Sequence, residues 1–207
     1  MSGTLYTLDA ICQHAEEIKK SRFLAQAAPV TTADDALAFV RRVSDPAATH
    51  NCWAYRIGQD YRFNDDGEPG GTAGRPILQA IEGQGIDRAV VVVTRWYGGI
   101  KLGAGGLVRA YGGSAAECLR RAPRTPIVAM AQLALHCEFG ELALLKARLK
   151  DWTAQIEHEA FDATGVSLVI SLPEAQVGEA IARIADMSRG RMLPRRLMGT
   201  SSNLHGT

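Results

Sequence analysis

A buried strand, a glycine-rich turn and a helix follow one another without interruption between residues 89 and 121. Ala89 to Thr94 is an apolar, largely β-branched run, which is typical of a buried strand. Five glycines then fall within residues 98–106, and Leu107 to Arg121 has the pattern of a helix. Glycines leave backbone N–H groups accessible, and the start of a helix carries partial positive charge. This order predicts a mixed fold with a candidate anion site where the helix begins.

Positively charged side chains flank the glycine turn, which strengthens the interpretation as an anion- or nucleic-acid-binding site. The turn is neither a Walker A motif nor a dinucleotide fingerprint, because it lacks the G-K-[ST] ending and the G-x-G-x-x-G spacing. The alternative is that the glycines serve close packing and turns with positive φ. The candidate binding residues are Arg95, Gly98, Gly99, Lys101, Gly103, Gly105, Gly106 and Arg109.

A second loop, residues 63–74, is rich in acidic residues and glycine. Its carboxylates belong to Asp65, Asp66 and Glu68, which can bind Mg²⁺ or act as an acid–base pair. The spacing does not fit a calcium-binding EF-hand loop. The alternative is a solvated turn in which Asp66 or Glu68 caps the next helix. We therefore treat this loop as a possible second binding loop and assign no catalytic residue, no metal and no cofactor.

Cysteine usage and charge restrict the class of protein. The four cysteines are scattered without a C-x-x-C pair, which indicates reduced thiols and a cytoplasmic location. His50 and Cys52 share one face of a strand, but no second pair completes a zinc site. The net charge is +1, so any nucleic-acid contact needs a local basic patch. One candidate patch comprises Arg189, Arg191, Arg195 and Arg196.

The remaining patterns predict an α+β chain with two domains. In the first, residues 16–30 are extended, a helix opens at Thr32 and stops near Pro46, His50 to Ile57 is a strand, and residues 72–81 form a helix. Two prolines in residues 122–126 indicate a boundary. Beyond them the order is βαββαβ, with strands at 127–137, 152–161, 165–172 and 191–197 and helices at 141–149 and 173–187. The predicted domains are residues 1–122 and 127–199, followed by a tail at 200–207.

Several segments resemble the IMPACT/YigZ family. The family signature R-[aromatic]-[aromatic]-G-G-x-x-L-G stands here from Arg95 to Gly103. Further matching segments are residues 17–23, 50–54, 65–74 and 105–111. The resemblance implies a first domain like the second domain of a small-subunit ribosomal protein and domain IV of elongation factor G. It implies a ferredoxin-like second domain like domain V of that factor.

The resemblance also implies a role close to translation, because both folds recur in proteins that contact RNA or the ribosome. Eukaryotic members of the family regulate translation initiation. We therefore expect a non-enzymatic, cytoplasmic protein that binds RNA or the ribosome, without membrane association. Two alternatives stay open. One is an enzyme acting on a small phosphorylated or anionic substrate through the acidic and glycine-rich loops, and the other is a regulatory module that binds a protein partner.

Overall fold

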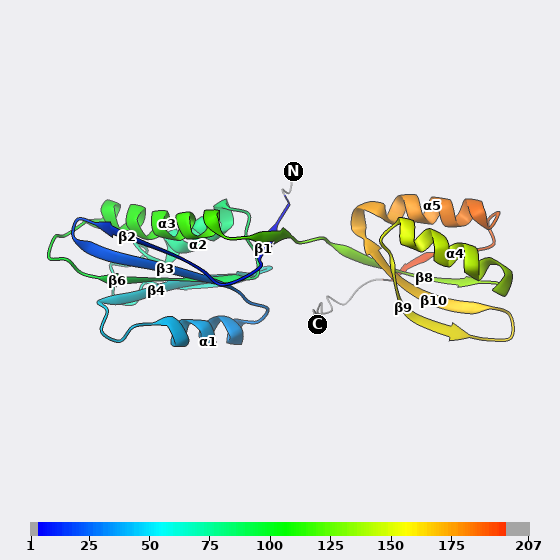
Figure 1. The fold of residues 1–207 in the computed structure, drawn as a ribbon, viewed down its shortest axis with the longest axis horizontal. Helices are drawn as coiled ribbons and strands as arrows, with labels where there is room; N and C mark the ends of the chain where they lie inside the picture. The colour runs from blue at the N-terminus through cyan, green and yellow to red at the C-terminus, as the bar shows by residue number, and fades with distance from the viewer. Residues whose placement is uncertain (1–3, 198–207) are drawn as a thin grey trace. The chain divides into compact units, whose positions relative to one another are not determined.

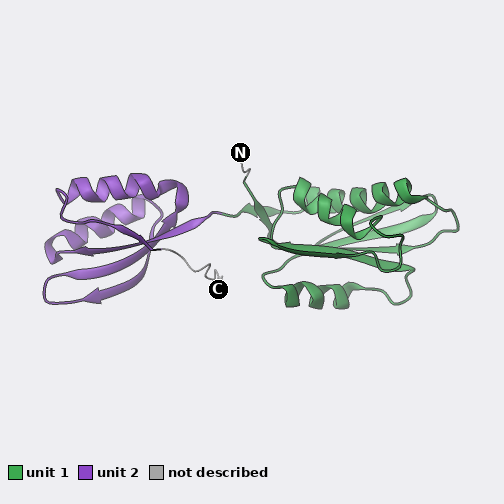
Figure 2. Cartoon of the chain, turned by 180° about the vertical axis from the view of Figure 1, so that it is seen from behind, with its two compact units in different colours: residues 1–127 green, residues 128–207 purple. Residues whose placement is uncertain are grey.

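The computed structural model describes residues 4–197, and the chain divides into two compact units, Met1–Ile127 and Val128–Thr207 (Figure 2). The described residues have a mixed α/β structure with three sheets and five α-helices. Residues near the predicted domain boundary form a short strand, β7 (Arg124–Pro126), which pairs antiparallel with β1 (Tyr6–Leu8). The predicted tail, residues 200–207, lies outside the described residues.

The first unit is built on an antiparallel five-stranded sheet with the order β2-β3-β6-β4-β5. Its central strand β6 (Ala89–Trp96) is buried from Ala89 to Arg95, as the apolar run predicts. The other strands are β2 (Cys12–Ile18), β3 (Ser21–Pro29), β4 (His50–Ile57) and β5 (Asp60–Asn64). The end of β6 therefore projects the glycine turn from the middle of the sheet.

Helices cover both faces of this sheet (Figure 1). One core contains Val91 and Val93 of β6 with the apolar sides of α2 (Gly74–Gly83) and α3 (Ala104–Arg121). The other contains Val90 and Val92 with α1 (Ala33–Val43). Alternate side chains of a strand point to opposite faces, so a strand buried on both faces must be apolar throughout.

The predicted start of α1 is confirmed. Thr32 is the N-cap residue, its hydroxyl accepts a hydrogen bond from the backbone of Asp35, and the Asp35 carboxylate accepts one from the backbone of Thr32. This reciprocal pair satisfies donors that the first helical turn leaves free. The helix ends at Val43, just before Asp45 and Pro46 as expected.

The segment predicted as extended, residues 16–30, is extended except at one turn, because it contains the end of β2 and all of β3, which form a hairpin. Ile18 pairs with Ser21, so Lys19 and Lys20 form a two-residue turn, with φ angles of 47° and 65°. Positive φ at both positions is the type I′ arrangement, which Asn and Gly favour. Two lysines carry no such signal, which explains why the turn was not predicted. Strand β5 was also missed, since it is short and fully exposed and its last two residues fall in the segment predicted as the acidic loop.

The second unit follows the predicted βαββαβ order. Its four-stranded sheet has the order β11-β8-β10-β9, and α4 and α5 pack on one face (Figure 1). Pro173 ends a strand instead of opening the predicted helix, which begins at Val177 after a 3-10 turn, and the last strand begins at Arg195 instead of Arg191. The elements are β8 (Met130–Cys137), α4 (Phe139–Asp151), β9 (Gln155–Phe161), β10 (Val166–Pro173), the 3-10 turn η1 (Glu174–Gln176), α5 (Val177–Met187) and β11 (Arg195–Leu197).

Candidate functional site

The glycine turn connects the end of β6 to the start of α3, as the sequence predicts. Gly103 is the N-cap residue of α3, and no side chain caps the helix or places an acidic group in its first turn. Gly99 and Gly103 have φ angles of 87° and 71°, in the region where glycine is favoured. The first backbone N–H groups of α3 consequently have no side-chain acceptor among the described residues, which leaves them available to an anion.

Gly98 has a packing role. A Cβ atom built on it would lie 1.8 Å from the carbonyl oxygen of Lys20 at the tip of the β2–β3 hairpin. The backbone N–H of Gly98 also donates to the Ser21 hydroxyl at 3.2 Å. The glycine turn and the hairpin tip therefore lie directly against each other, and the packing interpretation holds for this glycine.

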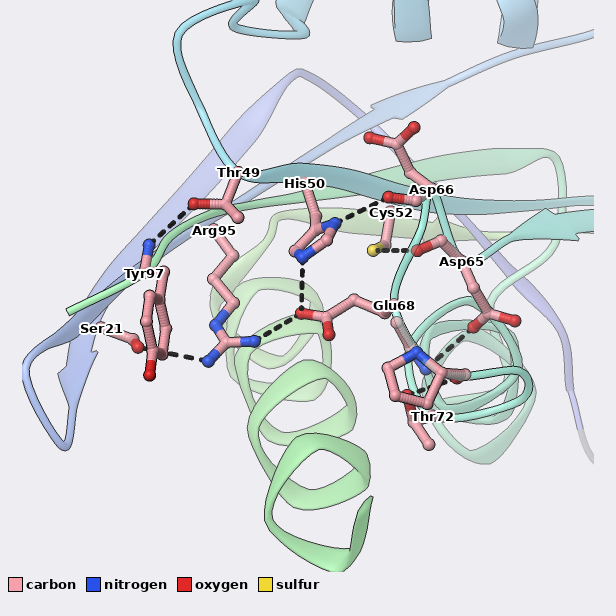
Figure 3. Close-up of polar contacts among 12 residues, drawn as sticks. Ser21, Thr49, His50, Cys52, Asp65, Asp66, Glu68, Thr72, Arg95 and Tyr97 are labelled. Carbon is pink, nitrogen blue, oxygen red and sulfur yellow. Dashed lines mark hydrogen bonds and ion pairs between the residues drawn. The ribbon is translucent and has the colours of Figure 1, made fainter. Parts of the chain in front are cut away.

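The acidic loop and the end of β6 meet in a buried hydrogen-bonded cluster (Figure 3). One oxygen of the Glu68 carboxylate lies 2.6 Å from the Arg95 guanidinium and accepts the Tyr111 hydroxyl at 2.7 Å. The same guanidinium lies 3.4 Å from the Ser21 hydroxyl. His50 adds a longer contact, with its Nε2 at 3.7 Å from Glu68. Glu68 and Arg95 are thus brought together, and Arg95 is neutralised within the protein.

The two aspartates of the acidic loop bind backbone groups. The Asp65 carboxylate accepts hydrogen bonds from Gly71, Ala73 and Gly74, at 2.8, 3.0 and 2.8 Å, and so holds the start of α2. The Asp66 carboxylate accepts the backbone N–H of Asn51 at 2.6 Å. Each carboxylate therefore already serves the loop structure. Residues 4–197 contain no cluster of three or more His, Cys, Asp or Glu side chains that could hold a metal ion.

The Cys52 thiol beside this cluster and the Tyr111 phenol within it are poor nucleophiles. Burial raises the pKa of Cys52 well above its usual range, and the Cys52 thiol donates to the Asp65 carbonyl at 3.0 Å. Burial also raises the pKa of Tyr111 far above its usual value, and nearby Cys52 and Glu68 add to the shift. Both groups stay neutral at physiological pH, so neither supplies a nucleophile, and the hydrogen bonds of the cluster serve to hold the fold.

Unlike the buried Arg95, four positively charged side chains around the glycine turn are exposed. Lys101 in the turn, Arg109 in α3 and both lysines of the hairpin tip are exposed. We call these four residues, Lys19, Lys20, Lys101 and Arg109, the basic turn region. Within residues 4–197, none of the four forms an ion pair with a carboxylate. Their positive charge is directed to solvent, beside the exposed side chains of Tyr97 and Ile100.

Two of the four arginines near the C-terminus differ from the basic turn region, because Arg191 and Arg196 form ion pairs, whereas none is found within residues 4–197 for Arg189 and Arg195. Arg196 lies 2.8 Å from Glu174, and Arg191 forms an ion pair with Glu141. Both acidic partners are distant along the chain, so the sequence around the arginines gave no sign of this pairing. Pairing reduces the net positive charge that this cluster presents.

Three contributors to the buried cluster were not predicted as part of a site, namely Ser21, His50 and Tyr111. Tyr111 offered a signal, because it lies on the apolar stripe of its helix, where a buried phenol needs a hydrogen-bond partner. His50 was considered with Cys52 as a zinc ligand, but the sequence showed no link of His50 or Ser21 to the Glu68–Arg95 pair, since those contacts depend on strand pairing. Among the described residues, no helix is long and apolar enough to cross a membrane.

Two family models match the chain. The Impact N-terminal domain matches residues 19–119, and the Domain of unknown function (DUF1949) matches residues 135–191. The first match contains the glycine turn, the acidic loop and the buried cluster.

Individual relatives match nearly end to end. An IMPACT family member from Thermus thermophilus is 49% identical over 176 residues, which cover 84% of this chain and 97% of that protein. The IMPACT family member YigZ of Escherichia coli is 41% identical, over 86% of this chain and 90% of that protein. A crystal structure of a hypothetical protein is 37% identical, with a TM-score of 0.65 over 95% of this chain and 98% of that one.

Proposed function

This chain belongs to the IMPACT family, and we propose that it is a non-enzymatic cytoplasmic protein that contacts RNA or the ribosome and modulates translation. The family resemblance supports a regulatory role close to translation. The free thiols of all four cysteines fit a reducing compartment.

The observation that carries the proposal is the basic turn region. Unpaired Lys and Arg side chains beside an uncapped helix N-terminus are the groups that contact nucleic-acid phosphates. Lys101 lies in the turn, and Arg109 follows on the first turns of α3. The hairpin tip packs against Gly98, which adds Lys19 and Lys20 to the same region. Local charge of this kind attracts phosphate even though the whole chain is nearly neutral.

Arg95 has a different part in this proposal. Because its guanidinium is buried against Glu68, we infer that it positions the end of β6 and the turn, while the exposed cations contact phosphate. We propose that the backbone N–H groups of the turn glycines contact phosphate. Gly98 packs against the hairpin tip and so fixes the conformation of the turn.

The fold is consistent with this function. We infer that the second unit is ferredoxin-like, because its element order and its sheet order β11-β8-β10-β9 give the split-βαβ arrangement. The proposed likeness of the two units to elongation factor G domains IV and V points to the ribosome. Fold likeness alone does not establish function, so the surface charge carries more of the argument.

The enzymatic alternative gains no support from the acidic loop. It requires free carboxylates facing the glycine turn, whereas Asp65, Asp66 and Glu68 all accept hydrogen bonds from the protein itself. Within residues 4–197, the hydrogen bonds that connect Glu68 to Gly98 run through Arg95 and Ser21. No specific observation favours a protein partner over RNA.

A salt-titrated binding assay with a structured RNA tests the proposal. Each phosphate-contacting cation adds about one unit to the slope of log affinity against log salt. The double variant Lys101→Ala and Arg109→Ala should lower the slope by about two units and weaken binding. The matched control is Lys146→Ala with Arg183→Ala, because those cations are already paired with Glu159 and Glu179. Salt-independent binding, or equal losses in the two double variants, would refute the proposed surface.

A further inference from the structure

Two cysteines from distant parts of the chain lie side by side in the first unit. The Sγ atoms of Cys12 and Cys118 are 3.6 Å apart, although 106 positions separate them in the sequence. Cys12 lies on the edge strand β2, and Cys118 lies near the end of α3. A disulfide has sulfur atoms about 2.05 Å apart, so the two sulfur atoms must approach by only about 1.5 Å to be joined.

The two thiols differ in accessibility and acidity. Cys12 is half-buried, whereas Cys118 is only 1% exposed. A hydrogen bond from the Cys118 thiol lowers the pKa of Cys12, and the same hydrogen bond, together with burial, raises the pKa of Cys118. The accessible sulfur is therefore the one favoured as thiolate, which is the reactive form of cysteine. The other two cysteines, Cys52 and Cys137, are buried with raised pKa values.

We propose that Cys12 and Cys118 form a peroxide-reactive site that closes into an intramolecular disulfide between β2 and α3. The Cys12 thiolate attacks one oxygen of hydrogen peroxide, so the O–O bond breaks, a sulfenic acid forms and the other oxygen leaves as water after taking up a proton. The Cys118 sulfur then attacks the Cys12 sulfur. The S–O bond breaks, the S–S bond forms and the hydroxide leaves as water with the Cys118 proton. Two thiols are oxidised and one peroxide is reduced to two waters.

The disulfide would connect two elements that support the basic turn region. Strand β2 leads into the hairpin tip at Lys19, and α3 starts at the glycine turn. At the edge of the sheet β2 pairs with only one strand, β3, so a covalent link to α3 would restrain its local opening. The inference rests on the cysteine geometry and stands whether or not the protein binds RNA.

The test uses the chain of residues 1–207, reduced and then treated with stoichiometric hydrogen peroxide. Alkylation under denaturing conditions should label four thiols before oxidation and two afterwards. Peptide mapping without reductant should recover a Cys12–Cys118 cross-linked peptide that has lost two hydrogen atoms, and thiol reductant should reverse it. A Cys12 that proceeds to sulfinic acid while Cys118 stays reduced would overturn the proposal, as would a protein that keeps all four thiols.

Single variants assign the two roles. In Cys118→Ser, whose hydroxyl can still donate a hydrogen bond to the Cys12 sulfur, Cys12 should accumulate as a sulfenic acid that a dimedone probe captures. In Cys12→Ser, Cys118 should remain unmodified. The matched control Cys137→Ala removes a buried cysteine of the other unit and should keep the cross-link. A dimedone adduct of Cys118 in Cys12→Ser would overturn the assigned order of attack.

Discussion

The carboxylate of Glu68 and the guanidinium of Arg95 form a buried ion pair at 2.6 Å, with side chains 4% and 6% exposed. The pair joins the acidic loop to the central strand at the point where the glycine turn begins. Tyr111 donates a further hydrogen bond to the same Glu68 oxygen, so α3 is tied to both. One internal salt bridge therefore connects the acidic loop to the strand that leads into the glycine turn.

Removing one partner of this pair should be strongly destabilising. In Arg95→Met the Glu68 charge stays buried with only neutral or distant partners, and we expect the free energy of unfolding to fall by about 3–5 kcal/mol. Urea denaturation of the full chain measures this change. The control Arg183→Met removes an exposed pair with Glu179 and should cost less than about 1 kcal/mol. A loss at Arg95 no larger than at Arg183 would contradict the structural role.

Alanine substitution at two glycines, one in the turn and one in α3, should change the stability of the protein in opposite directions. Gly98→Ala places a methyl group 1.8 Å from the Lys20 carbonyl oxygen, where both partners are backbone and cannot rotate away. We expect a loss of about 1–3 kcal/mol, the range for overpacking. Gly113→Ala lies within α3 with nothing within 4 Å, and should gain roughly 0.5–1 kcal/mol from the better helix former. Thermal unfolding of both variants checks the sign, and a stabilised Gly98→Ala protein would refute the close contact.

Patterns that depend on local sequence were predicted well. The strand at residues 89–94 has an apolar residue at nearly every position, so its burial on both faces followed from composition alone. Thr32 followed by Asp35 indicated the start of α1. The alternation of strand and helix patterns along residues 127–197 likewise predicted the βαββαβ order of the second unit.

Features that depend on strand pairing or on contacts between distant segments were not predicted. The turn at Lys19 and Lys20 adopts positive φ because the two flanking strands fix it, and lysine itself gives no sign of this. Arg95 was interpreted as a phosphate contact, because the sequence does not show that Glu68 would meet it inside the protein. The partner of a charged residue at the end of a buried strand can be identified only when the position of the loop that supplies this partner is known.

Asp65 should stabilise the fold as the acceptor that holds the start of α2. Its carboxylate accepts three backbone N–H groups, from Gly71, Ala73 and Gly74, and alanine would leave those donors without it. We expect Asp65→Ala to lower the free energy of unfolding by roughly 1–2 kcal/mol, as for the loss of a helix cap. Asp34→Ala is the control, because Asp34 sits in the first turn of α1 and contributes about 0.3–1 kcal/mol through the helix dipole. Hydrogen exchange of the α2 amides gives a local measure, and unchanged protection in Asp65→Ala would contradict the role.

Asp162, in the turn between β9 and β10, should make the second unit sensitive to acid. Hydrogen bonds from the Thr164 hydroxyl and the backbone of Thr164, followed by that of Gly165, lower the pKa of Asp162 to about 2. A carboxyl group has a pKa of about 3.9 in the unfolded chain, so the folded state favours the charged form. Its contribution is fully present above about pH 4 and is lost as the pH falls through about 2. An NMR titration of the Asp162 carboxyl should give a midpoint near 2, and the stability difference from Asp162→Asn should shrink over the same interval. A midpoint near 3.9, or a difference that stays constant with pH, would show that these hydrogen bonds do not favour the charged carboxylate.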